Sequence, residues 1–178
     1  ARMTFFVDVG FLIKLDEFRA QFPQLDQDYE NIAAQLRELV AKGHDVQLHI
    51  HPHWEDCTYN GTKWNIDVTR YKLDDFEDED IRRIVRTYKE KLEEVSGQEI
   101  QSYRAGGWCL QPFSRVKAAF EENGLVLDST VFPQGHFESK HYYYDFRNAP
   151  NKPRYRFDDD LCVESENGRF WEFPIGHD

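Results

Sequence analysis

The sequence of 178 residues has only three cysteines, one methionine and no long hydrophobic run. Cys57, Cys109 and Cys162 are an odd number without C-x-x-C spacing, which argues against a disulfide framework and against a thiolate zinc site. No stretch is long and apolar enough to span a membrane. No signal peptide is visible, and the sequence leaves both a cytoplasmic location and one in the cell envelope open.

Positive charge is also scarce, because 22 Lys and Arg residues stand against 33 Asp and Glu residues, for a net charge of −11. Such an acidic chain is not expected to bind a nucleic-acid backbone or an anionic membrane surface. Much of the acidity lies in two runs, at residues 74–80 and 158–160, which we interpret as solvated surface. The length predicts a single domain over residues 1–178 with a sizeable core.

Histidine, in contrast, is concentrated in one place. Three of the seven histidines, His49, His51 and His53, lie within five residues, at the end of the apolar, strand-like stretch Val46–Ile50 and directly after it. Neutral imidazole is the commonest metal-binding side chain and suits zinc and neighbouring transition metals. The cluster therefore predicts a metal site, and the alternative is a histidine-rich loop with solvated rings.

The spacing of the three histidines allows two pairings around a metal. In an extended strand all three point to one face, and neighbours two apart lie about 7 Å from each other at Cα, which suits joint ligation. Pro52 cannot donate to a sheet ladder, so we expect the strand to end just before it. If the chain turns there, His49 and His53 converge instead. The residues by themselves leave both pairings open.

Strand-like and helix-like stretches alternate along the chain. A long, polar, aromatic-bearing loop is expected at residues 54–75, and Asn167-Gly168 predicts a hairpin. Repeated strand-helix-strand units imply parallel strands with helices outside them. The expected strands cover residues 3–9, 45–50, 100–103, 125–129, 161–165 and 169–173, and the expected helices cover residues 31–41, 78–95 and 112–123.

Parallel α/β folds bind ligands at the carboxyl ends of their strands, and three suggestive segments fall there. They are the histidine cluster, Arg104-Ala105-Gly106-Gly107-Trp108 and Asp128-Ser129-Thr130. Their agreement favours one shared site. The structural alternatives are that Arg104 is an ion-pair partner, that the glycines form a turn, and that Asp128 caps a strand end.

These segments resemble the motifs of the polysaccharide deacetylases. Members of that family carry an A-T-F-F-V strand, to which Met3-Thr4-Phe5-Phe6-Val7 is similar. They then carry G-H-E-I-G-x-H-[ST]-x-x-H, which residues 43–53 resemble in order and spacing. Arg104 and Pro112 keep the spacing of the family's third segment, and Leu127-Asp128-Ser129 resembles the strand end that follows. The resemblance spans nearly the whole chain.

The resemblance implies a NodB-like fold, which is a distorted (β/α) barrel of about seven parallel strands. It also implies a metal-dependent hydrolase that removes acetyl groups from N-acetylated or O-acetylated sugars of a polysaccharide or cell-surface glycan. The implied cofactor is a divalent metal ion, with zinc expected, and its histidine ligands are His49 and His53.

The family's first motif, T-F-D-D-G, supplies the general base and the third metal ligand, and it is absent from this sequence. Either the chain lacks its N-terminal first-motif segment, which is our expectation, or the protein has lost both carboxylates. Asp8, at the end of the first strand, could substitute as a carboxylate ligand, although a strand-end Asp is more often a cap or turn residue.

The resemblance assigns further roles residue by residue. Arg104 would orient the base carboxylate, the N–H of Gly107 would stabilise the oxyanion, and Asp128 would tune the general acid. His177, near the end of the chain, is a candidate for that acid. Trp54, Trp108 and Tyr143 are candidates for stacking on the sugar rings of the glycan, with ordinary packing as their structural alternative.

Two other classes of function stay open. The missing Asp pair favours a catalytically inactive, carbohydrate-binding pseudoenzyme of the same fold. The same metal could also serve hydrolysis of another bond, such as a phosphoester, but that reading predicts more cationic groups near the histidines than the sequence offers.

Overall fold

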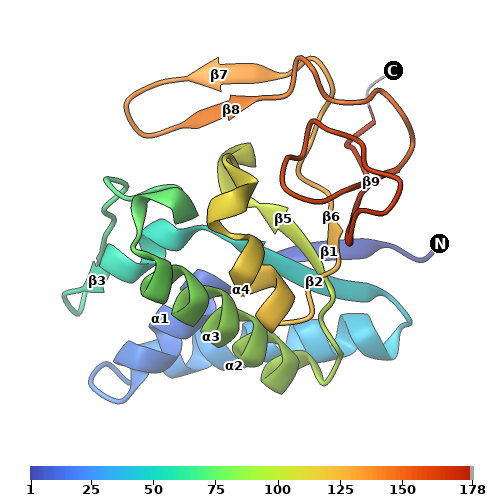
Figure 1. Ribbon diagram of the computed structural model, residues 1–178. Coiled ribbons are helices and arrows are strands. Elements are labelled where there is room, and N and C mark those ends of the chain that lie inside the picture. Colours follow the sequence, from blue (N-terminus) through green and yellow to red (C-terminus); the bar gives the residue numbers. More distant parts are fainter. Residues whose placement is uncertain (177–178) are drawn as a thin grey trace.

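The structure, a computed structural model, describes residues 1–176 and is built on a six-stranded sheet (Figure 1). Its strand order is β1-β2-β5-β6-β10-β9. The first five strands of that order run parallel, and β9 is antiparallel to β10. The strands are β1 (Thr4–Asp8), β2 (Asp45–Ile50), β5 (Ser102–Ala105), β6 (Leu127–Asp128), β9 (Tyr155–Phe157) and β10 (Phe170–Glu172).

Four helices gather on one side of this sheet (Figure 1): α1 (Val9–Arg19), α2 (Gln24–Ala41), α3 (Asp78–Ser96) and α4 (Lys117–Glu122). Contacts join α1 to α2 and α3, and α3 to β2 and α4. The sequence of α3 explains both its helical structure and the face that it buries. Ile81, Ile84, Val85, Tyr88 and Leu92 recur at helical spacing and are buried, whereas acidic residues occupy its first turn and Gly97 ends it in the left-handed conformation.

Side chains along β2 point alternately to the two faces of the sheet, one toward the core and the other toward the candidate site. Val46, Leu48 and Ile50 are fully buried among the helices. Successive strand side chains point to opposite faces, so Gln47 and His49 lie on the other face of the sheet. That face is hollowed by a cavity of about 420 Å³ lined by residues of β1, β2, β5 and β6 and by Phe173.

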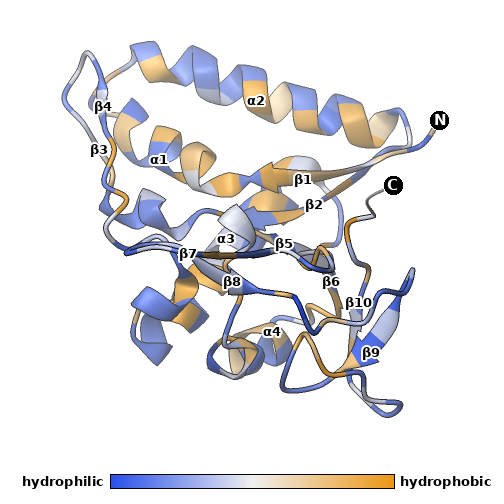
Figure 2. Cartoon of the chain, turned by 90° about the horizontal axis from the view of Figure 1, so that it is seen from above, coloured by the Kyte–Doolittle hydropathy of each residue, from blue (hydrophilic) through white to orange (hydrophobic). Residues whose placement is uncertain are grey.

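The remaining elements are short. Two hairpins, β3 (Thr58–Tyr59) with β4 (Trp64–Asn65) and β7 (His136–Glu138) with β8 (Tyr143–Asp145), are not part of the main sheet. In the view from above, β3 and β4 lie to one side of the sheet, whereas β7 and β8 cross over it (Figure 2). The 3-10 helices are η1 (Pro52–Asp56), η2 (Leu73–Asp75), η3 (Gly106–Trp108) and η4 (Phe113–Arg115). Within residues 1–176, no helix has the length and apolar character needed to cross a membrane.

The α/β class with a parallel sheet is confirmed, but two expectations need correction. Instead of a barrel of about seven parallel strands, residues 1–176 form an open sheet with β1 and β9 as its edges, and the last pairing is antiparallel. The expected hairpin at Asn167-Gly168 also has a different first strand. Residues 155–157 pair with β10, because Leu161 is drawn into the core and residues 161–165 turn instead.

The interior of the sheet holds a pair of carboxyl groups where β6 and β10 end. Asp128 and Glu172 are partners in the parallel register and are 1% and 0% exposed. Thr130 donates its N–H and its hydroxyl to Asp128, over 3.0 and 2.7 Å, and the N–H of Val131 donates to Glu172 over 3.1 Å. Oε2 of Glu172 is buried and has no hydrogen-bond partner in the described part of the chain. Two carboxylates cannot donate to each other, so Glu172 can donate toward Asp128 only while it keeps its proton.

Burial raises the pKa of both groups, and for Glu172 the neighbouring charge of Asp128 adds to the effect. Because the pKa of Glu172 is well above its ordinary value of 4.5 in the folded protein, the folded state binds a proton that the unfolded state releases. The stabilisation by this proton is complete below pH 4.5 and is lost as the pH rises through the folded-state pKa.

We therefore expect the unfolding free energy of the wild type to fall between pH 5 and pH 9 more than that of Glu172→Gln. The amide keeps a donor toward Asp128 and cannot ionise, so the difference should reach roughly 1.4 kcal/mol for each unit by which the pKa is raised. Urea unfolding at several pH values measures it. The exposed Glu138→Gln is the matched control, and equal slopes for all three proteins would contradict the shared proton.

Candidate active site

The candidate site lies at the carboxyl edge of the parallel sheet, where β1, β2 and β5 end. Asp8 of β1 is the register partner of His49, and His49 is the register partner of Arg104 in β5. Register partners on neighbouring strands point to the same face. The structure thus brings three of the candidate residues into one row across three strands.

His49 and His51 turn their rings toward each other, with 3.0 Å between the two Nε2 atoms. Nδ1 of His49 lies 2.8 Å from the carbonyl oxygen of Arg104. A carbonyl oxygen only accepts, so Nδ1 carries the proton and Nε2 of neutral His49 keeps its lone pair. Two nitrogens bound to one zinc ion at about 2 Å each are separated by about 3 Å, which matches this pair.

His53 lies beside this pair, 5.5 Å from His51 between ring centres. Its ring stacks on Tyr71 at an interplanar angle of 6° and on Trp54 at 26°. Its Nδ1 is buried and has no hydrogen-bond partner in the part of the chain that the structure describes. Burying a polar nitrogen without a partner costs free energy of folding. A bound metal ion would satisfy this nitrogen, which supports the ligand role predicted for His53 without testing it.

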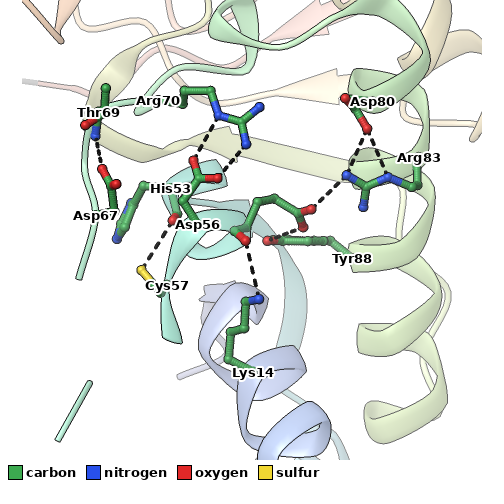
Figure 3. Close-up of polar contacts among 11 residues, drawn as sticks. Lys14, His53, Asp56, Cys57, Asp67, Thr69, Arg70, Asp80, Arg83 and Tyr88 are labelled. Carbon is green, nitrogen blue, oxygen red and sulfur yellow. Dashed lines mark hydrogen bonds and ion pairs between the residues drawn. The ribbon is translucent and has the colours of Figure 1, made fainter. Parts of the chain in front are cut away.

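The short helix η1, which carries His53, is anchored on three sides (Figure 3). Arg70 binds Asp56 through two nitrogens. The carboxylate of Glu55 accepts from Arg83 of α3 over 2.8 Å and from the Tyr88 hydroxyl over 3.1 Å. Lys14 of α1 reaches the Glu55 carbonyl oxygen at 3.4 Å. These contacts hold the backbone of the histidine cluster against α1 and α3.

All three imidazoles are in the neutral charge state from which a histidine metal ligand forms. Burial lowers the pKa of His49, His51 and His53, and the positive charge of a neighbouring imidazole adds to this effect for His49 and His51. For His51 the pKa falls to about 4. The rings are therefore neutral at pH 7, with lone pairs available as ligands.

Asp8 caps helix α1 and binds Trp54. One carboxylate oxygen accepts from the N–H of Gly10 over 3.2 Å, and the other accepts from the Trp54 indole N–H over 2.9 Å. Burial raises the pKa of Asp8, while the Trp54 hydrogen bond and the charge of His49 lower it. Trp54 also packs against Phe11, so its predicted stacking on a sugar stays a prediction.

The residues of this site provide only some of the ligand atoms that a zinc ion needs. The neutral nitrogens of His49 and His51 suit such an ion. Among residues 1–176, however, no three His, Cys, Asp or Glu side chains converge closely enough to hold a metal ion. A third protein ligand requires a side chain to turn: His53 offers an unused nitrogen, whereas Asp8 would have to share its oxygens with Trp54.

The other predicted catalytic residues occupy different positions. Arg104 donates to the carbonyl and the hydroxyl oxygen of Ser129, both over 2.8 Å, and lies over the ring of Phe6. Asp128 is bound by Thr130 in the sheet interior, beside Glu172. His177 lies outside the described residues, so its predicted role as an acid is untested.

Gly107 and Trp108 lie in η3, and Tyr143 is the first residue of β8. Gly107 and Trp108 both adopt positive φ, 57° and 61°, within η3 directly after β5. Trp108 stays 41% exposed although it contacts Phe132 and Tyr144, and Tyr143 is 39% exposed. A large exposed aromatic side chain on a strained backbone next to a site is a candidate binding surface.

Sequence reasoning missed two residues of this region as functional candidates. Tyr71 is buried against His51 and His53, and Glu172 shares the interior with Asp128. The only sequence signal for Tyr71 was its place in a long loop rich in aromatic residues. Glu172 carried no signal that distinguishes it from a solvated strand-end residue.

Searches against protein-family models and against curated proteins find no match for this chain. A comparison of structures finds the crystal structure of a “putative polysaccharide deacetylase” from Mycobacterium smegmatis, with a TM-score of 0.50 and 19% sequence identity. The alignment covers 97% of this chain and 40% of that protein, so this chain spans well under half of its length.

At this identity the likeness concerns the fold. The chain has a polysaccharide-deacetylase-like α/β fold, and the resemblance predicted from its sequence is confirmed at that level.

Proposed function

We propose that this chain is the α/β domain of a metal-dependent hydrolase that removes acetyl groups from N-acetylated or O-acetylated sugars of a polysaccharide or cell-surface glycan. The observation that carries the proposal is the pair of neutral histidine nitrogens, 3.0 Å apart, at the carboxyl edge of a parallel sheet. The substrate class comes from the sequence motifs and from the name of the structural neighbour.

The proposed ion is divalent, with zinc as the expected metal, and His49 and His51 hold it. The convergence of their Nε2 atoms supports this pair. The motif resemblance instead supports His53 as the partner of His49, with Asp8 as the carboxylate ligand. When bound, such an ion polarises a carbonyl group and lowers the pKa of a bound water.

The residues of the chain supply the remaining parts of an acyl hydrolysis. Asp8, beside His49 in the register, would accept the proton of the attacking water, and the Trp54 indole holds its carboxylate in place. The N–H of Gly107 would donate to the developing oxyanion. Trp108 and Tyr143 would hold the sugar through their exposed rings.

A carbohydrate-binding pseudoenzyme is the second candidate. It is favoured by one observation, which is that no third metal ligand converges with His49 and His51 in the described part of the chain. Metal binding and acetate release, measured separately, distinguish this candidate from the hydrolase.

Metal binding tests the ligand assignment. We expect the wild type to bind about one zinc ion per chain, because the histidine pair offers one site. His49→Ala and His51→Ala should each weaken zinc binding at least about 100-fold, because each removes a nitrogen bonded to the metal. His53→Ala should have a smaller effect. Titration calorimetry and metal analysis after gel filtration measure the affinity and the stoichiometry.

The exposed His136→Ala is the control for these variants, since it removes an imidazole from the surface strand β7. If His53→Ala lost the metal and His51→Ala kept it, the pairing implied by the resemblance would be right. A wild type that binds no zinc would remove the metal-dependent hydrolase from consideration.

Acetate release from N-acetylated and O-acetylated oligosaccharides tests the reaction. Asp8→Asn should lower kcat about 10²-fold to 10⁴-fold with little change in KM, because it removes the general base. Trp108→Ala should instead raise KM about threefold to tenfold through the loss of a stacking contact. Phe137→Ala, which removes another exposed aromatic ring, is the control. Zinc binding without acetate release from any substrate would favour the pseudoenzyme.

A further inference from the structure

Three polar contacts connect Tyr71 to the end of β5 through the histidine pair. The Tyr71 hydroxyl lies 3.0 Å from Nδ1 of His51, Nε2 of His51 lies 3.0 Å from Nε2 of His49, and Nδ1 of His49 lies 2.8 Å from the Arg104 carbonyl oxygen. Tyr71 is only 7% exposed, so the far end of this chain of contacts is also shielded from water.

The direction of each hydrogen bond follows from the carbonyl at one end. The backbone carbonyl oxygen of Arg104 only accepts, so neutral His49 donates from Nδ1 and presents a bare Nε2. In the metal-free protein, the 3.0 Å contact is a hydrogen bond only if His51 carries its proton on Nε2. Nδ1 of His51 is then bare, and the Tyr71 hydroxyl must donate to it.

If Nε2 of His51 held a metal ion, the arrangement of protons at His51 would be reversed. Nε2 must give up its proton to act as a ligand, and the neutral ring then carries its proton on Nδ1. Nδ1 now needs an acceptor, and a hydroxyl oxygen can accept as well as donate. The Tyr71 hydroxyl proton can then turn away from His51, toward the side of Tyr142, whose ring centre lies 4.1 Å from that of Tyr71.

The backbone after β5 is shaped around this contact. A Cβ on Gly106 would lie 2.7 Å from Nδ1 of His51, and a Cβ on Gly107 would lie 2.7 Å from the Tyr71 ring. A side chain at Gly106 would collide with the His51 ring, and one at Gly107 would collide with the Tyr71 ring. The Gly-Gly pair beside Arg104 therefore has a steric reason, which is the close approach of His51 and Tyr71.

We propose that Tyr71 is a positioning residue for His51, whose hydroxyl donates to Nδ1 in the metal-free protein and accepts from Nδ1 when Nε2 binds a metal ion. The inference deepens the proposed function and rests on it for the metal-bound state. The two states contain the same number of protons: His51 loses one from Nε2 to solvent and takes one at Nδ1 from solvent, while Tyr71 keeps its own and rotates it.

Ring nitrogen chemical shifts of ¹⁵N-labelled histidines, measured by NMR at pH 7.5, test both states. In the metal-free wild type we expect His51 to be protonated on Nε2, with the Nδ1 resonance shifted by an accepted hydrogen bond. In Tyr71→Phe that shift of Nδ1 should disappear, because the ring remains and only the donor is removed. Zinc saturation of the wild type should move the proton of His51 to Nδ1.

Zinc affinity gives the second measurement. Tyr71→Phe should bind zinc about 10-fold to 100-fold more weakly than the wild type, as is usual when the outer partner of a ligating histidine is lost. Tyr59→Phe makes the same chemical change elsewhere in the 54–75 loop and should match the wild type in both measurements.

The outcomes separate this inference from the proposed function. A metal-free His51 protonated on Nδ1, or an Nδ1 resonance unchanged in Tyr71→Phe, would overturn the positioning role whether or not zinc binds. Equal zinc affinity of Tyr71→Phe and the wild type would overturn it as well. A wild type that shows the expected metal-free shifts but binds no zinc would refute the proposed function and the metal-bound state, and leave Tyr71 as the hydrogen-bond donor to His51.

Discussion

Parallel pairing of β2 between β1 and β5 is the constraint on which the candidate site depends. It sets Asp8, His49 and Arg104 in one row, although they come from three separate segments of the chain. The same pairing turns the alternate residues of β2 into the core, where Val46, Leu48 and Ile50 are fully buried. A slip of one residue would exchange these two sets of side chains, so the packing of the helices also fixes the register of the site.

The edge of the sheet concentrates polar groups that are costly to bury, and the structure offsets this cost with specific hydrogen bonds. The carbonyl of Arg104 fixes the tautomer of His49, the indole of Trp54 binds Asp8, and Thr130 binds Asp128. Burial keeps the imidazoles neutral and raises the pKa of Asp8 and of the Asp128–Glu172 pair. Low solvent access thus keeps the imidazoles uncharged, and the proposed metal site relies on this because neutral imidazoles do not repel a cation.

Loops distant in sequence complete the site above the sheet. Helix η1 is tied to α1 and α3, and η3 brings Gly106 and Gly107 against His51 and Tyr71. The β7–β8 hairpin contributes from a third direction, since Tyr142 at its turn packs on Tyr71 and His141 lies 3.1 Å from the carbonyl of Thr69. In Figure 1 this hairpin stands apart from the helices, at the end of the sheet where the site lies. The position of the hairpin is therefore coupled to the histidine cluster through Tyr71.

Local patterns in the sequence determined the strand at residues 45–50, whose bounds the structure reproduces, and the long amphipathic helix α3. They also indicated the alternation of strands and helices that leads to a parallel sheet, in which His49, Arg104 and Asp128 lie on β2, β5 and β6. The sequence patterns did not predict helix α1. Its apolar residues form a nearly continuous run without helical periodicity: Val9, Phe11, Leu12, Ile13 and Leu15. Only the tertiary structure decided that the sheet is open, that β9 pairs with β10, that the Nε2 atoms of His49 and His51 converge, and that Tyr71 and Glu172 belong to the buried polar groups. The physical reason is that these features are contacts between segments far apart in the chain, and periodicity reports which face of an element is buried without naming the residues that it meets.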